Sequence, residues 1–106
     1  MPPAFEAHVP PELADLLPEF LNNRKTQLEA LRHAMQARDF ERLREHANSM
    51  IGVGAPYGFP DVSTLGRRID VSARERDAAT VADLIELYAN YLANVRVELA
   101  AKATPA

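Results

Sequence analysis

Hydrophobic residues recur at helical spacing through most of this chain. The first long stripe lies between Pro18 and about Ala37, and it consists of Phe20, Leu21, Leu28, Leu31, Ala34 and Met35. Spacings of three and four residues are typical of one face of an α-helix. A proline inside a helix removes a hydrogen bond and clashes with the preceding turn. Pro18 therefore predicts a short helix that ends near Leu17, followed by a long one that begins at Pro18.

Three further stripes predict three further helices. The clearest, with spacings of three and four residues in alternation, consists of Phe40, Leu43, Ala47, Met50 and Gly54. The other two consist of Val62, Leu65 and Ile69, and of Val81, Leu84, Ile85, Tyr88, Leu92, Val95 and Leu99. Short polar side chains cap helix N-termini, so we expect caps at Asp39, at Asp61 or Ser63, and at Asp77. Because the residue before proline avoids the α conformation, Pro56 predicts an early end to the second of the four long helices.

The chain shows almost no signal for β-structure, since it has neither alternating β-branched runs nor an Asn-Gly or Asp-Gly turn. Short connections favour antiparallel neighbours. The predicted fold is all-α: an up-down antiparallel four-helix bundle with a short extra N-terminal helix. We expect residues 1–10 to be a loose proline-rich segment, residues 11–101 the bundle, and residues 102–106 a C-terminal tail.

Composition narrows the classes of function. The 106 residues suit one domain, and the absence of cysteine excludes disulfides and thiolate chemistry. A net charge of −3 gives no electrostatic reason to expect a nucleic-acid or anionic-membrane partner. There is no long apolar run and no signal-peptide pattern. His8, His33 and His46 do not have the spacing of metal ligands. We expect a cytoplasmic monomer without cofactor or metal.

The stretch from Ala47 to Ser63 is the most unusual part of the chain. It contains Gly52 and Gly54 where the helical pattern continues. Glycine costs about 1 kcal/mol relative to alanine inside a helix. Either the backbone is left bare so that another molecule can approach it, or two helices pack closely at these positions.

Several of its residues resemble histidine-containing phosphotransfer (HPt) domains. The resemblance covers roughly residues 11–100 and is carried by Leu16-Leu17-Pro18-Glu19-Phe20-Leu21, by Gly54-Ala55-Pro56-Tyr57-Gly58-Phe59-Pro60, and by Tyr91-Leu92-Ala93-Asn94-Val95-Arg96-Val97. HPt domains carry phosphate between receiver domains on an exposed histidine, within the pattern A-H-x-x-K-G. In this alignment Ala47 and Gly52 match the pattern, but Asn48 occupies the histidine position and Ile51 the lysine position.

The two replacements remove the chemistry of the motif. A neutral imidazole nitrogen can attack a phosphoryl group, whereas the nitrogen lone pair of a carboxamide is delocalised into its carbonyl. Isoleucine cannot supply the positive charge that helps to hold the phosphoryl group. The resemblance thus implies a non-catalytic HPt domain that binds a receiver domain of a response regulator or hybrid kinase as an adaptor or competitor.

The expected partner-binding residues are Arg44, Asn48, Ile51, Gly52 and Ala55. For Arg44, pairing on a solvated helix face with Glu41 and Glu45 is the alternative, and for Ile51 it is burial at the bundle edge. Two other functions stay open. His46 could accept phosphate in place of Asn48, although helical rotation directs it about 160° away from Asn48, toward a neighbouring helix or the side of the bundle. The bundle could also serve self-association through the Ile51 side.

Overall fold

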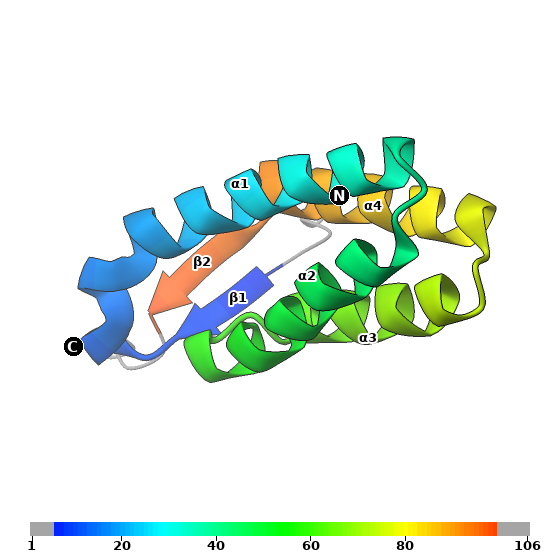
Figure 1. Cartoon of the computed structure of the whole chain (residues 1–106). Coiled ribbons are helices and arrows are strands. Elements are labelled where there is room, and N and C mark those ends of the chain that lie inside the picture. Colours follow the sequence, from blue (N-terminus) through cyan, green and yellow to red (C-terminus); the bar gives the residue numbers. More distant parts are fainter. Residues whose placement is uncertain (1–5, 100–106) are drawn as a thin grey trace.

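The computed structural model describes residues 6–99, with side chains from residue 9 to residue 95 (Figure 1). Its four main helices are α1 (Leu17–Gln36), α2 (Phe40–Val53), α3 (Pro60–Arg74) and α4 (Ala78–Asn94). Two short 3₁₀ helices, η1 (Pro11–Leu16) and η2 (Ala55–Tyr57), precede α1 and follow α2. Two four-residue strands, β1 (Glu6–Val9) and β2 (Arg96–Leu99), flank the helical part.

The prediction of four helices packed together is confirmed. The α2 and α3 helices pack most extensively, α4 contacts α3 and α1, and α1 contacts α2. The predicted apolar stripes supply the core, which includes Phe20, Leu28, Leu31, Ala34, Leu43, Ala47, Met50, Val62, Leu65, Ile69, Val81, Leu84, Ile85 and Tyr88. Within the described residues, no helix is both long and apolar enough to cross a membrane.

Two of the three predicted helix caps are confirmed. The carboxylates of Asp39 and Asp77 each accept a hydrogen bond from the backbone N–H three residues later, at 3.0 and 3.2 Å. The α3 helix begins differently, because Phe59 is its N-cap and Pro60 occupies the first turn. The expected cap at Asp61 or Ser63 was therefore wrong. Proline suits this position because the first helical N–H groups have no partner within the helix.

The two short strands were not predicted. They pair in parallel, with Glu6 opposite Arg96 and Val9 opposite Leu99. Figure 1 shows them side by side at the end of the bundle where α1 begins and α4 ends. Residues 6–9 are thus not a loose segment, and Val9 is fully buried in the core. Residues 1–5 of the expected loose segment, residues 100–101 of the expected bundle and the expected tail at residues 102–106 lie outside the described residues.

The predicted fourth helix was also too long. It ends at Asn94, because Val95 adopts an extended conformation with ψ of 136°. Val95 and Leu99 are four residues apart, which fits a helix, but Val97 and Leu99 also fit the period of a strand. A four-residue strand is too short for periodicity to distinguish the two.

Candidate functional site

The predicted partner-binding residues lie together along the second half of α2 and the start of η2. Asn48, Gly52 and Ala55 are exposed, whereas Arg44 and Ile51 are half-buried. Asn48 follows Arg44 by one helical turn and precedes Gly52 by one turn, so these three share a face. Within the described chain, α2 therefore presents a narrow surface on which a polar side chain adjoins uncovered backbone.

The side chain of Asn48 is held by hydrogen bonds. Its Nδ2 donates to the backbone oxygen of Arg44 at 2.8 Å and, more weakly, to Oδ1 of Asp70 on α3 at 3.4 Å. Both neighbours are acceptors, so they fix which end of the carboxamide carries the nitrogen. Its carbonyl oxygen remains as the acceptor that a partner can meet.

Asp70 organises the charges beside Asn48. Its carboxylate accepts hydrogen bonds from Nε of Arg44 at 3.0 Å and from Nη2 of Arg74 at 2.9 Å. The Asp70 side chain is only 12% exposed, against 35% for Arg44 and 57% for Arg74. A carboxylate this far from water needs such partners, because unpaired it would lose its hydration without compensation. Two arginines around one aspartate leave this three-residue cluster with one net positive charge.

This network was not predicted from the sequence. Arg44 was expected either to pair along its own helix or to face a partner, and its side chain instead forms a hydrogen bond from α2 to Asp70 on α3. A signal was available in the sequence. Asp70 directly follows the inward-facing Ile69 and precedes Arg74 by four residues, which is the spacing of an ion pair on one helix.

The two glycines of the stretch from Ala47 to Ser63 have different environments. A Cβ built on Gly52 would meet no atom within 4 Å, whereas one on Gly54 would lie 2.5 Å from the backbone nitrogen of Ser63. Gly54 is therefore required by packing. Gly66 on α3 has the same role, since its Cβ would lie 2.7 Å from the backbone oxygen of Ala47. Only Gly52, of these three, leaves the backbone accessible without a packing reason.

The lower end of the site is fixed by a buried serine. Ser63 Oγ accepts a hydrogen bond from the backbone N–H of Ala55 at 2.8 Å and donates to the backbone oxygen of Ile51 at 2.9 Å. These bonds satisfy groups that the end of α2 leaves free. The helix ends at Val53, as Pro56 predicted, and η2 follows directly.

Ile51 lies at the boundary between α2 and α3. It is half-buried, and its Cγ1 would be 3.1 Å from a Cβ placed on Gly66. Much of the side chain therefore packs against α3, which agrees with the alternative expectation that Ile51 is buried at the edge of the bundle. A smaller part stays available at the surface beside Asn48.

His46 lies on a different flank of α2 from Asn48. It is half-buried, and its backbone oxygen accepts a weak hydrogen bond from Gln27 of α1 at 3.4 Å. Burial and the nearby positive charge of Arg42 lower the pKa of its imidazole. His33 is exposed on α1, and in the described part of the chain no three His, Asp or Glu side chains are arranged to hold a metal ion.

Comparison of this chain with models of known protein families, with curated proteins and with solved structures finds no match. The similarity to HPt domains therefore depends on the residues quoted from the sequence.

Proposed function

We propose that this protein is a non-catalytic HPt domain, with the up-down topology of that family, and that it binds receiver domains through the exposed face of α2. The residues at the centre of this surface are Asn48 and Gly52. Arg44 and Ile51 border it, and Ala55 marks its end. The protein would act as an adaptor or competitor in a phosphorelay and would not itself accept phosphate.

The observation that carries the proposal is the environment of Gly52. Its position is exposed, and a side chain there would meet nothing within 4 Å. Because the space around it is open, packing does not explain this glycine, and glycine lowers the stability of a helix. Uncovered backbone one turn after Asn48 leaves room for a partner loop to approach α2 closely.

The charges suit the same partner. Arg44 can meet an acidic surface of a receiver domain, and together with Arg74 it gives the cluster around Asp70 one net positive charge. Complementary charge mainly increases the rate of encounter and fixes orientation. The carbonyl oxygen of Asn48 then adds a directed acceptor at the position where the family has its histidine.

A binding assay with purified receiver domains from the same host tests the proposal. Gly52→Arg fills the open space over α2, so we expect it to abolish receiver capture. Ala82→Arg is the matched control, because Ala82 is exposed on α4, which packs against α1 and α3. The control should bind as wild type does. Equal capture by Gly52→Arg and wild type would refute the proposed surface.

A further inference from the structure

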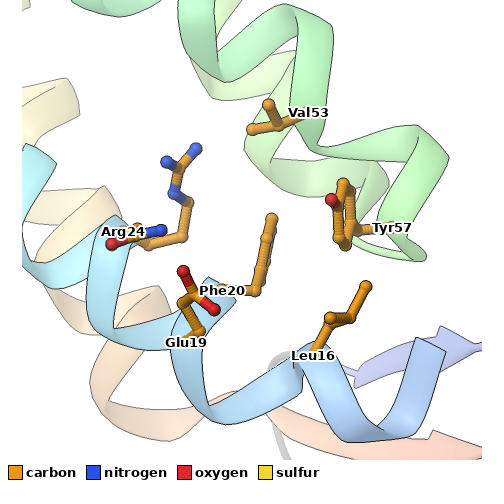
Figure 2. A pocket seen from close by; sticks show the side chains of 7 residues that line it. Leu16, Glu19, Phe20, Arg24, Val53 and Tyr57 are labelled. Carbon is orange, nitrogen blue, oxygen red and sulfur yellow. The ribbon is translucent and has the colours of Figure 1, made fainter.

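A cleft separate from the Asn48 surface lies between the start of α1 and the end of α2. Its volume is about 320 Å³, and it is lined by Leu16, Glu19, Phe20, Arg24, Val53 and Tyr57, with Asn23 beside them. Figure 2 shows the guanidinium group of Arg24 directed toward Val53, next to the Phe20 ring. This volume is within the range of clefts that bind small molecules.

The unusual feature of this cleft is a buried arginine without an acceptor. Arg24 is only 8% exposed, and its Nε and Nη1 have no hydrogen-bond partner among the described residues. Its guanidinium carbon lies 5.2 Å from the centroid of the Phe20 ring, and the nearby hydroxyl of Tyr88 is engaged with Gln27. A π-face offsets only part of the hydration that a buried cation loses. Among residues 6–99 the guanidinium therefore has no anionic partner.

The other walls of the cleft are mainly apolar. The Phe20 ring stacks on Tyr57 with centroids 4.7 Å apart, and it also contacts Phe59 at 4.8 Å. Leu16 is 43% exposed, which is high for a large apolar residue, and Val53 is half-buried opposite it. An apolar body in the cleft would cover Leu16 and the edge of the aromatic stack.

The charges in the cleft select the kind of anion. Arg24 supplies one buried positive charge, and the exposed carboxylate of Glu19 lies at the edge. One carboxylate neutralises the guanidinium, whereas a second negative charge would be repelled by Glu19 and would lose its hydration without a partner. We propose that this cleft binds a small monocarboxylate with an apolar body, which pairs with Arg24 and covers Leu16 and the Phe20–Tyr57 stack. This site does not depend on receiver binding.

Titration of the full-length protein with hexanoate, followed by amide NMR shifts, tests this site. We expect saturable shifts centred on Phe20, Val53 and Tyr57. Arg24→Met should weaken binding by about tenfold or more, because the charge-assisted hydrogen bonds are lost. Arg68→Met is the matched control, since Arg68 is exposed on α3, and it should bind as wild type does. Where Arg24→Met does not fold, Arg24→Gln gives the same test.

Two further ligands separate the contributions to binding. Hexan-1-ol keeps the apolar body and removes the charge, and inorganic phosphate keeps an anion and removes the apolar body. Both should bind at least about tenfold more weakly than hexanoate, if charge and apolar contact each contribute. Absence of saturable shifts with hexanoate, or equal affinity of wild type and Arg24→Met, would overturn the proposal. So would tighter binding of phosphate than of hexanoate.

Discussion

Alanine at Gly52 should stabilise the protein, whereas alanine at Gly54 or Gly66 should destabilise it. Gly52→Ala places a methyl group in open space, so the variant gains the helix preference of alanine without a clash. We expect it to be more stable by about 0.5–1 kcal/mol. In a domain of this size, 1 kcal/mol raises the melting temperature by about 4–8 °C.

Gly54→Ala and Gly66→Ala should destabilise the protein. At Gly54 the added Cβ would lie 2.5 Å from the backbone nitrogen of Ser63, 2.6 Å from its Oγ and 2.7 Å from the backbone oxygen of Phe59. Its φ of −65° suits any residue, so the penalty is steric. Overpacking costs about 1–3 kcal/mol, and displacement of the Ser63 hydroxyl adds about 1 kcal/mol for each hydrogen bond lost.

Urea unfolding followed by circular dichroism at equal protein concentration measures all three variants against wild type. Gly66→Ala should behave like Gly54→Ala, because its Cβ would press on the backbone of α2 at 2.7 Å. A Gly52→Ala variant less stable than wild type would show that the fold itself needs this glycine, which would contradict a role for Gly52 in partner binding alone. A Gly54→Ala variant as stable as wild type would refute the close packing.

Three other predictions concern the backbone at Arg38 and Arg76, the imidazole of His46 and the ion pairs of Asp70. Arg38 and Arg76 both have positive φ, 54° and 56°, so Arg38→Gly should stabilise the protein by about 0.5–1 kcal/mol in thermal melts. Arg76→Gly should gain less, because Arg76 also lies over the Phe40 ring at 5.4 Å, and an equal gain would contradict that contact. The lowered pKa of His46 means that the unfolded chain binds more protons just below its ordinary pKa of 6.5. Stability should therefore fall as the pH drops below about 6.5, and His46→Gln should reduce this fall in unfolding measured from pH 7.5 to 5. Asp70→Asn removes the negative charge that two arginines share, and we expect it to lower the free energy of unfolding by about 1–3 kcal/mol, a loss that changes little with salt concentration. A urea midpoint equal to that of wild type would refute this prediction.

Much of the fold follows from the sequence because its helices have regular apolar stripes. The breaks at Pro18 and Pro56 and the caps at Asp39 and Asp77 depend on local chemistry, so the residues themselves reveal them. The β1–β2 pair could not be predicted in this way. It joins residues 6–9 to residues 96–99, and such distant pairing leaves no local period.

The shared face of Asn48 and Gly52 could be predicted from the sequence, but their contacts could not. The two residues are four positions apart in a helix, and both are exposed on α2. The network around Asp70 joins two helices, so its partners were known only from the packed structure. The same holds for Arg24, which occupies a core position in the series Phe20, Arg24, Gln27 and Leu31. The spacing of apolar residues does not identify a charged residue that is buried among them.

The most direct test of the central claim is to mix the purified protein with receiver domains from its host that carry labelled phosphate. We predict that at least one receiver is captured and that no acid-labile label appears on the protein, because Asn48 cannot attack phosphorus. Label on the protein that disappears in His46→Ala would contradict the claim and identify an active phosphotransfer protein.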